Sequence, residues 1–483
     1  MAAAALACLV GAGGGSAAAQ PAAAPSAVSA ALATPLTASQ IGLLLDALGQ
    51  ADTHGLETDA FDPARLEALL KSPDAQDRQL GHAQLVAAVL RYARSVHSGR
   101  LAEADFDEDW GLHPAPYDPA PEFLHAVQTD QVKPWLESLP PPYTGYQTLR
   151  QGLATYRQIA AHGGWEPISA GPTLKPGASG KRVLELRARL AAEDPTLAPS
   201  SSDIFDEPLG QAVARAQKRF GLKDDGIVDA DTLEALNTPI EERIDQILAN
   251  MERWRWLPQE LPTDRIQVNI AAAVLTLFHA DSPTMSMRAV TGRPGDETPM
   301  LQSQIQSIVL NPPWNVPSTI AAKELWPKEK AHPGYLKAHD FVVVPTDGGG
   351  TRLQQKAGTS SALGRIKFDF PNPYAVYLHD TPTHATFDRY SRLASHGCVR
   401  LQKPRPLAEA LLQADPDWTA ERIDATIASG KTVRVPVPQP ISVFLLYWTA
   451  YVGPDGQVNF RDDPYGWDKS LVQRLRAAAG SPA

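Results

Sequence analysis

The residue types best suited to covalent chemistry in this chain are Cys398 and His379, which lie nineteen positions apart. A thiol with an ordinary pKa of about 8.5 is mostly protonated at neutral pH, so a nucleophilic cysteine needs an imidazole or another positive field to yield thiolate. We expect Cys398 to be a nucleophile. We expect His379 to be the base that takes its proton and later returns one to a leaving amine.

The histidine follows a short run, Tyr374–Leu378, that predicts a β-strand. The end of a strand suits a catalytic group, because the sheet holds the side chain while the following loop admits substrate. A catalytic histidine must itself be oriented by a second group. The nearest candidates are the backbone carbonyl and the side chain of Asp380.

The cysteine lies in the segment Ser395–Arg400, which reads SHGCVR. Gly397 allows the backbone to turn tightly directly before the nucleophile. The amides of His396, Gly397 and Cys398 would then face one point, which predicts an oxyanion hole whose single donors typically contribute about 3 kcal/mol. We place Ser395 in the same pocket.

Cysteine usage supports a reactive role for this thiol. The chain has 2 cysteines in 483 residues, and Cys8 lies in an Ala/Gly-rich leader, residues 1–19, that predicts a signal peptide and export. Without the leader Cys398 is unpaired, which is a liability in an oxidising compartment unless the thiol is used. Two alternatives stay open: a buried, inert Cys398, and a lipidation box at Ala5–Cys8. One feature disagrees with a signal peptide: the first basic residue is Arg65, so the positive segment that should begin it is missing, and whether the start codon lies upstream stays open.

The overall composition excludes some classes of function. The formal net charge is −10 and no basic stripe with interleaved aromatic residues occurs, which argues against a nucleic-acid partner. No run of eighteen apolar residues occurs, so no transmembrane segment is expected. The length suffices for roughly two to four domains.

The N-terminal part predicts a tether followed by helices. Residues 20–36 are rich in Ala and Pro and predict a disordered linker. Residues 37–170 predict a helical scaffold domain without a catalytic cluster, because apolar residues recur there at helical spacing. One such helical face carries Leu85, Val89, Tyr92 and Val96.

Residues 174–238 predict a second unit of three short helices, with Asp231 and Glu234 as a capping box that opens the third helix. The run Phe220–Val228 resembles the end of the small three-helix peptidoglycan-binding module. The alternative is a generic helical bundle that binds nothing. Residues 239–258 predict a connecting helix that packs the modules together.

From Arg265 the apolar pattern changes to short β-branched and aromatic runs, which predict a mainly β domain over residues 264–436. An insertion at about 312–369 contains one helical piece and a hinge at Gly348–Gly350. It is either a lid or an ordered surface excursion. Residues 437–483 are expected to be an extension that packs on the β domain.

His379 followed by Ser-His-Gly-Cys-Val-Arg resembles the signature of YkuD-type L,D-transpeptidases. From about residue 37 the chain is similar to the large YcbB-like enzymes of Gram-negative bacteria. The resemblance implies a multi-domain α+β fold with a helical scaffold domain, a three-helix peptidoglycan-binding module and a mainly β catalytic domain carrying an inserted capping subdomain. Further segments fit it: Arg253–Pro258, Asn311–Pro317, Ala362–Arg365 and Tyr377–Pro382.

The resemblance also implies an activity. Cys398 would attack the L-centre carbonyl of diaminopimelate in a tetrapeptide stem and expel the terminal D-Ala. The acyl group would then pass to the side-chain amine of a neighbouring stem, which gives a 3→3 cross-link. No metal or other cofactor is implied. The partners would be peptidoglycan stem peptides and glycan in the periplasm, and no particular protein partner is predicted.

Site roles follow from the same resemblance. His379 would be the base, His396 would shape the pocket, and Arg400 would hold a carboxylate of the stem. Further candidates for binding the acidic stem are Tyr377, Arg389 and Arg392. Ordinary surface salt bridges are the alternative for these last two arginines.

Three other functions remain possible at this stage. His379, His384, His396 and Cys398 are all potential zinc ligands, although a structural site would usually recruit more cysteines. An L,D-carboxypeptidase would use the same Cys-His pair with water in place of the acceptor amine. A non-catalytic wall-binding protein would have lost its activity, against which the intact His379 and Cys398 argue.

Overall fold

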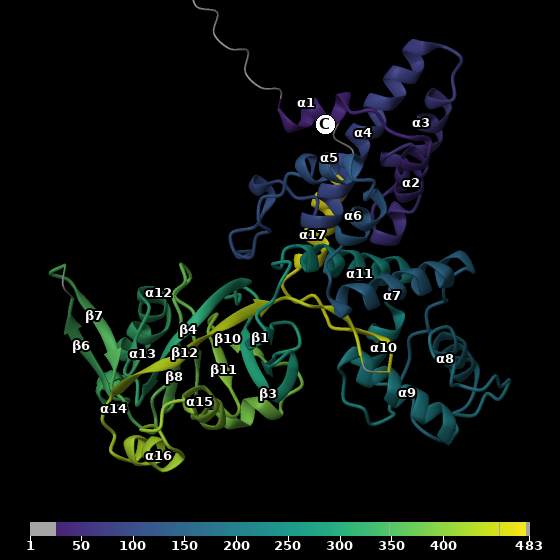
Figure 1. Cartoon of the computed structure of the whole chain (residues 1–483). Coiled ribbons are helices and arrows are strands. Elements are labelled where there is room, and N and C mark those ends of the chain that lie inside the picture. Colours follow the sequence, from purple (N-terminus) through teal and green to yellow (C-terminus); the bar gives the residue numbers. More distant parts are fainter. Residues whose placement is uncertain (1–25, 347, 454, 480–483) are drawn as a thin grey trace, which may run out of the picture.

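The chain folds into a helical half and a β-rich half, at the right and lower left of Figure 1. This computed structural model describes residues 26–346, 348–453 and 455–479, so the expected signal peptide at 1–19 lies outside the described residues. Within those ranges no single helix is long and apolar enough to cross a membrane. Helices α1 and α2 meet that test only as a pair, and a bend of 117° separates them.

The first six helices enclose a hydrophobic cluster of their own. The longest, α4, begins after Asp74, whose side chain accepts a hydrogen bond from the Gln76 amide at 2.6 Å, and it buries the apolar face predicted from its spacing. A seventh helix packs instead on the connecting helix. These elements are α1 (Ala27–Ala33), α2 (Ala38–Gly49), α3 (Pro63–Leu70), α4 (Ala75–Ser98), α5 (Ala120–Gln128), α6 (Val132–Ser138) and α7 (Thr144–Ala161).

Helix α1 corrects the expectation of a disordered linker over residues 20–36. The side chain of Ser26 caps it by accepting from the Ser29 amide, and Ala31 is fully buried against α4 and α5. Alanine has the highest helix propensity of all residues, so an Ala-rich segment with a surface to pack on becomes a helix. The prediction is wrong for 27–33, and residues 20–25 lie outside the described part.

The expected three-helix module is present as α8 (Lys181–Ala191), α9 (Glu207–Phe220) and α10 (Ala230–Asn237). Helix α10 begins two residues earlier than expected. Its N-cap is Asp229, whose Oδ1 accepts from the Thr232 amide at 2.9 Å, and not Asp231. Gly221 ends α9 in the left-handed region, with φ +68°, where a side chain would be strained.

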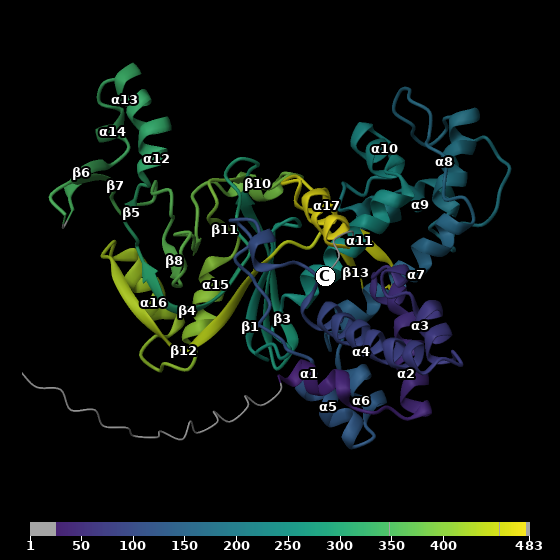
Figure 2. The same cartoon turned by 90° about the horizontal axis from the view of Figure 1, so that it is seen from above.

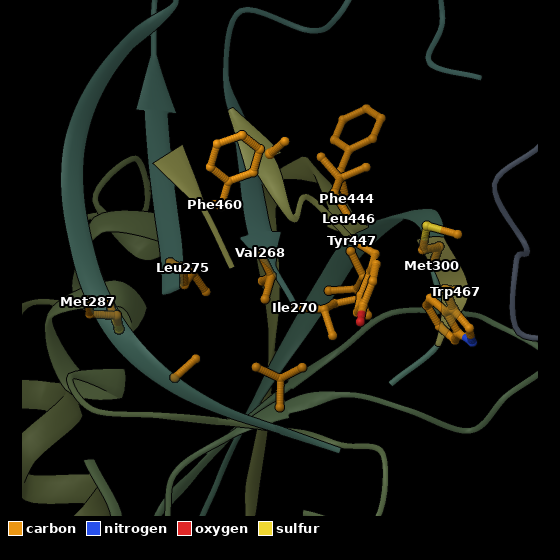
Figure 3. Packing of buried hydrophobic residues seen from close by; sticks show 14 of the residues in the cluster. Val268, Ile270, Leu275, Met287, Met300, Phe444, Leu446, Tyr447, Phe460 and Trp467 are labelled. Atoms are coloured by element: carbon orange, nitrogen blue, oxygen red, sulfur yellow. The ribbon is translucent and has the colours of Figure 1, made fainter. Parts of the chain in front are cut away.

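The connecting helix α11 (Ile240–Arg255) is buried along most of its length and packs on α7 and on the C-terminal helix α17 (Trp467–Ala479). One hydrophobic cluster runs from the three-helix module through α7 and α11 into the β domain. Figure 3 shows its continuity, from Val268 and Leu275 inside the sheet to Tyr447 and Trp467 at the junction. The helical and β halves therefore share a core.

Eight strands of the β domain pair in a closed ring in the order β1, β2, β3, β11, β9, β8, β4, β12, and β10 adds to β3. Helices α15 (Pro404–Leu412) and α16 (Ala420–Ala428) cover part of this sheet. The mainly β character is as predicted. The strands are β1 (Arg265–Asn269), β2 (Val274–His279), β3 (Ser282–Gly292), β4 (Leu301–Leu310), β8 (Ile366–Asp369), β9 (Leu378–His379), β10 (Leu393–Ser395), β11 (Val399–Leu401) and β12 (Val433–Leu446).

Strand β12 corrects the expected boundary at residue 436. The strand crosses a register shift between Pro436 and Ile441 and then continues beside β4 and β1 to Leu446. Prolines cannot donate to a ladder, so they suggested a strand end where the structure has a bulge. The rest of the extension, with β13 (Ala450–Val452) and β14 (Val458–Phe460), packs mainly on α7, α9 and α11.

The insertion forms a separate cap with a small core of its own. It ends before β8, because Ile366–Asp369 pairs with β4 in the main sheet, so the expected limit of 369 is four residues too late. The glycines at 348–350 belong to the turn between β6 and β7, not to a hinge. The cap lies at the opposite end of the molecule from the three-helix module (Figures 1 and 2). Its elements are β5 (Trp314–Asn315), α12 (Ser318–Ile320), a π-helix (Ala321–Leu325), α13 (Trp326–Ala331), α14 (Tyr335–Ala338), β6 (Phe341–Pro345) and β7 (Thr351–Gln355).

Candidate active site

Strands β9 and β11 bring the predicted base and nucleophile together. They pair in parallel, with Leu378 opposite Val399 and His379 opposite Arg400. Leu378 and Val399 are fully buried in the core. Because side chains alternate along a strand, His379 and Arg400 face the other side, as does Cys398, one residue before β11. His379 and Cys398 are therefore diagonal neighbours on adjacent strands, within reach of each other's side chains.

The strand before the histidine is shorter than predicted. Only Leu378–His379 forms β9, because Ala375 adopts a positive φ of +54° that interrupts an extended chain. The side chain of Asn372 holds this bend, since its Oδ1 accepts from the amides of Tyr374 and Val376, both at 3.1 Å. His379 therefore follows a fixed loop, although the sheet still orients it.

The imidazole of His379 is oriented by the backbone carbonyl of Asp380, one of the two candidates from the sequence. Nδ1 donates to that carbonyl at 2.5 Å, so Nε2 is left as an acceptor. The Asp380 carboxylate is used elsewhere, since its oxygens accept from the amides of Arg365 at 2.8 Å and Thr381 at 2.7 Å. Asp380 thus shapes the loop with its side chain and orients the base with its backbone.

His379 is uncharged at neutral pH. Its exposed fraction is 4%, and burial, followed by the positive charge of Arg400, lowers the pKa of His379 to about 3. Burial also raises the pKa of the partly exposed Cys398 thiol, although hydrogen bonds from the backbone and side chain of Tyr377 offset part of this effect. Since burial disfavours both charged forms, the resting pair is a thiol and a neutral imidazole.

The turn before the nucleophile is fixed from two sides. Gly397 has φ +100°, and a β-carbon there would lie 3.1 Å from the Glu297 carbonyl oxygen. The Ser395 hydroxyl donates to the Cys398 carbonyl at 2.6 Å, and Thr298 Oγ1 donates to the Gly397 carbonyl at 2.7 Å. Only glycine fits this conformation without strain.

One predicted oxyanion donor is already occupied. The Gly397 amide donates to Ser395 Oγ at 3.2 Å, so the expectation that it faces a substrate oxygen is wrong. Gly397 and Ser395 build the turn and are both buried. Among the residues that the structure describes, the backbone amides of His396 and Cys398 have no hydrogen-bond partner. The prediction of an oxyanion hole therefore rests on these two amides.

Two cations beside the pair differ in their partners. Lys367 on β8 lies opposite His379, is ion-paired with Asp369 at 2.6 Å, and places its Nζ 4.1 Å from the centre of the Tyr377 ring. Arg400 is partly buried, its Nε has no partner, and it forms no ion pair with any described residue. An unpaired guanidinium beside the thiol is available to bind an anionic group.

The sequence suggested Arg389 and Arg392, which precede the motif, for binding the acidic stem, but neither belongs to this cluster. Arg392 is used by the loop itself: Nη2 donates to the Ala272 carbonyl at 2.8 Å and Nη1 to the Arg389 carbonyl at 3.3 Å. Arg389 is exposed. Neither forms an ion pair within the described ranges, so the salt-bridge alternative is also not observed.

The cap contacts the nucleophile turn through Glu324 on its π-helix. Glu324 Oε1 lies 2.6 Å from His396 Nε2 and 3.5 Å from Arg293 Nη2. Partial burial alone would raise the pKa of Glu324, but the hydrogen bond from His396 together with the neighbouring positive charges, including Lys328 and Arg293, outweighs burial and lowers that pKa. Through this hydrogen bond His396 links the turn to the cap.

Sequence patterns missed Lys367 and Glu324, because neither is near the motif in the chain. The alternation of Ile366–Asp369 is a weak strand signal that would have placed Lys367 on one face. No pattern in the sequence indicated a role for Glu324. Within the described residues, no group of three or more His, Cys, Asp or Glu is arranged to hold a metal ion, and His384, one of the four suggested zinc ligands, is exposed.

Three family models match successive parts of the chain. Residues 35–153 match a model described as "Scaffold domain", residues 179–236 one described as "Putative peptidoglycan binding domain", and residues 263–435 the YkuD model, described as "L,D-transpeptidase catalytic domain". The order agrees with the predicted order of units.

A curated protein of Haemophilus influenzae, named "Putative L,D-transpeptidase", is 35% identical over 251 residues, which is 48% of this chain and 50% of that protein. The chain thus spans about half the length of the curated relative that it matches.

Two crystal structures of L,D-transpeptidases align with the chain. The one from Xylanimonas cellulosilytica is 15% identical and covers 58% of this chain and 100% of that one, with a TM-score of 0.17. The one from Stackebrandtia nassauensis is 14% identical and covers 57% and 97%, with a TM-score of 0.23. TM-scores this low carry no argument. The three domain matches do: residues 35–153, 179–236 and 263–435 match, in this order, the models of a scaffold domain, a putative peptidoglycan-binding domain and the YkuD L,D-transpeptidase catalytic domain.

Proposed function

We propose that this protein is an L,D-transpeptidase that forms 3→3 cross-links between peptidoglycan stem peptides through a cysteine acyl-enzyme. The observation that carries the proposal is the placement of His379, with Nδ1 tied to a carbonyl and Nε2 free, diagonally across two strands from Cys398. The match of this domain to the L,D-transpeptidase catalytic family supports it.

In the first step, a tetrapeptide stem presents the L-centre carbonyl of diaminopimelate to Cys398. Nε2 of His379 takes the thiol proton as Sγ forms a bond to the carbonyl carbon, and the carbonyl oxygen becomes an oxyanion. The amides of His396 and Cys398 are the donors for that oxyanion. Collapse breaks the amide bond, and the proton on His379 passes to the nitrogen of the departing D-Ala, leaving a thioester on Cys398.

In the second step, the side-chain amine of a neighbouring stem attacks the thioester. His379, neutral again after the first step, takes a proton from this amine as its nitrogen bonds to the acyl carbon. The thiolate leaves and regains that proton from His379. The energy of the original amide bond is conserved in the thioester, so no nucleotide or other cofactor is required.

A neutral resting pair of Cys398 and His379 suits these two reaction steps. A thiol whose pKa is raised and an imidazole whose pKa is lowered do not exchange a proton until a carbonyl carbon is close enough to accept the sulfur. This arrangement protects the thiol from wasteful reactions in an oxidising compartment, since thiolate is the reactive form. We place the reaction in the periplasm, where the wall polymer lies.

Substrate recognition uses the unpaired cation. The stem of the donor carries carboxylates, and Arg400 is the site arginine without an acidic partner among the described residues. We assign it to a stem carboxylate. Tyr377, whose ring lies 5.5 Å from that of His379 and beneath Lys367, forms the wall beside the thiol.

A product assay tests the proposed function. Purified protein is incubated with disaccharide-tetrapeptide, and the products are identified by mass spectrometry. We expect cross-linked dimers together with free D-Ala, and no product with the Cys398→Ala variant. Tripeptide without dimer would show an L,D-carboxypeptidase in which water replaces the amine. Unchanged substrate with wild-type protein would indicate a wall-binding protein without activity.

A further inference from the structure

A cavity of about 510 Å³ lies away from Cys398, at the junction of the helical and β halves. The end of α9 contributes Gly221, and α11 contributes Trp254. The hairpin of β1 and β2 contributes Gln267 and most of the residues 269–278, and further walls come from the loop Tyr390–Leu393 and the C-terminal extension around Trp448. Cavities between domains are frequent binding sites.

One wall of this junction cavity is aromatic. Trp254 and Trp448 stack with ring centres 4.6 Å apart and planes 19° apart. Tyr390, which also lines the cavity, has an exposed fraction of 44%. Flat aromatic faces that are fixed by stacking offer a rigid surface for the apolar face of a ligand.

Several polar groups around the junction cavity have no protein partner. Within the described part of the chain, no hydrogen bond is formed by the side-chain amide of Gln267, the phenol of Tyr390 or the carboxylate of Asp462. Two buried donors are also unsatisfied, Trp254 Nε1 and Arg392 Nε. Trp254 is 9% exposed, so its indole nitrogen is shielded from bulk water. Unsatisfied buried donors are costly and call for an explanation.

The two arginines that line the cavity have most of their donors occupied by neutral groups of the protein. Arg461 is used by the carbonyls of Arg219 and Phe460 and by the phenol of Tyr451. The guanidinium of Arg392 is likewise used by loop carbonyls. The free groups are a neutral amide, a neutral phenol and one carboxylate. A carboxylate repels the acidic stem but accepts hydrogen bonds from hydroxyl groups.

We propose that the junction cavity binds a segment of the glycan strand, with the apolar face of an N-acetylated sugar on Trp448 and Tyr390 and its hydroxyl and acetamido groups on Gln267 and Asp462. The identity of the sugar rests on the proposed function. Position supports the same occupant: Gly221 ends a helix of the domain matched to peptidoglycan binding, and the loop Tyr390–Leu393 leads into β10 and the nucleophile turn. A glycan here holds the polymer while its stem reaches the catalytic strands.

The test uses full-length protein with Cys398→Ala, so that binding is measured without turnover. The probe is a peptide-free oligomer of β-1,4-linked N-acetylglucosamine, titrated while tryptophan fluorescence or calorimetric heat is followed. We expect saturable binding that Tyr390→Ala and Gln267→Ala each weaken by about tenfold. Trp326→Ala is the matched control, because this residue is 45% exposed and begins α13 of the cap, which contributes no residue to the cavity. It should bind like the parent.

Three results would overturn the proposal: absence of saturable binding, equal affinity in the Tyr390→Ala variant, or displacement of the oligosaccharide by a sugar-free tetrapeptide. The second substitution protects against misfolding, since Gln267→Ala and Tyr390→Ala alter different elements. Failure here is distinct from failure of the proposed function. If cross-linked dimers form but the oligosaccharide does not bind, only the proposed glycan site is wrong. If the oligosaccharide binds but no dimers form, only the proposed transpeptidase activity is wrong.

Discussion

His54 and His379 are both buried, and each lies beside a tyrosine and an arginine. Where the first helices meet α7 and α11, His54 Nδ1 lies 3.0 Å from the phenol of Tyr146, and Arg255 donates to that phenol at 3.1 Å and to the His54 carbonyl at 2.5 Å. Glu252, with Oε2 2.7 Å from Arg255, completes this group, which we call the junction cluster and which is separate from the junction cavity. Every charge in it has a partner.

In the site cluster the tyrosine is Tyr377 and the arginine is Arg400, but the place of the carboxylate is taken by the thiol of Cys398. The Nε of Arg255 and that of Arg400 both lack a partner, but Arg255 is paired with Glu252, whereas Arg400 forms no ion pair with any described residue. His379 keeps a free Nε2 because its other nitrogen is tied to a carbonyl. We assign substrate binding and reaction to Arg400 and to this Nε2, because they have no partner within the described protein.

The two histidines show that a shifted pKa alone does not identify a site. Burial is the first cause at both positions and lowers the pKa of each to about 3. What separates them is the neighbourhood: the arginine beside His54 is paired with a carboxylate, and the arginine beside His379 is not paired with any described residue.

Exchanging the two histidines for glutamine gives the largest expected difference. His379→Gln should lower the rate of cross-linking by about 10² to 10⁴-fold, because glutamine cannot act as a base, with little change in the melting temperature. His54→Gln should lower stability by about 1 kcal/mol through the lost bond to Tyr146, and leave the rate per folded molecule unchanged. Steady-state kinetics and thermal unfolding of both variants check this. An equal loss of rate in both would remove the contrast.

Glu252→Gln tests the closed character of the junction cluster. The amide has the same shape but leaves Arg255 as a buried charge without a counterion, which should cost about 3–5 kcal/mol of folding free energy. Urea unfolding followed by circular dichroism measures that loss. Wild-type stability in this variant would mean that the ion pair contributes nothing.

Arg400→Gln tests the open character of the site cluster. No stability should be lost, since no carboxylate of the described chain depends on this arginine. KM for a stem with free carboxylates should rise by about 10 to 100-fold, the usual range for hydrogen bonds to charged groups. A stem amidated at its carboxylates should be used equally by variant and wild type. A variant that loses the same factor on the amidated stem would assign Arg400 to another role.

Acid should weaken the fold through both histidines. Each has a pKa of about 3 in the folded protein and about 6.5 when unfolded. Between these values the unfolded chain binds more protons, so stability is complete above about pH 6.5 and falls as the pH is lowered toward 3. The slope is at most about 1.4 kcal/mol per pH unit for each histidine. Unfolding curves at several pH values should show a shallower slope in each His→Gln variant, and an unaltered slope in both would refute the burial argument.

The local part of the site could be predicted from sequence because its residues are contiguous. The turn at Gly397 and the base after a short strand depend on a few neighbouring residues, and their reactive types limit the chemistry. The fold class and the three-helix module were also readable, since apolar spacing and turns are local signals. The catalytic roles of Cys398 and His379 stay predictions.

The features that the sequence did not predict depend on contacts between distant segments. Lys367 reaches His379 only through pairing of β8 with β9, and Glu324 only through the fold of the cap. The occupied amide of Gly397 depends on how Ser395 turns inward. Helix α1 and the second half of β12 were missed because their packing partners are distant in the chain: α1 packs on α4 and α5, and β12 pairs with β4 and β1.

The most direct test of the central claim is the mass of the acyl-enzyme. Wild-type protein is mixed with a tetrapeptide donor without acceptor, quenched in acid within a turnover and digested for mass spectrometry. The peptide containing Cys398 should gain the mass of the stem without its D-Ala, and His379→Gln should accumulate this adduct more slowly. An adduct on another residue, or cross-linking by the Cys398→Ala variant, would contradict the account.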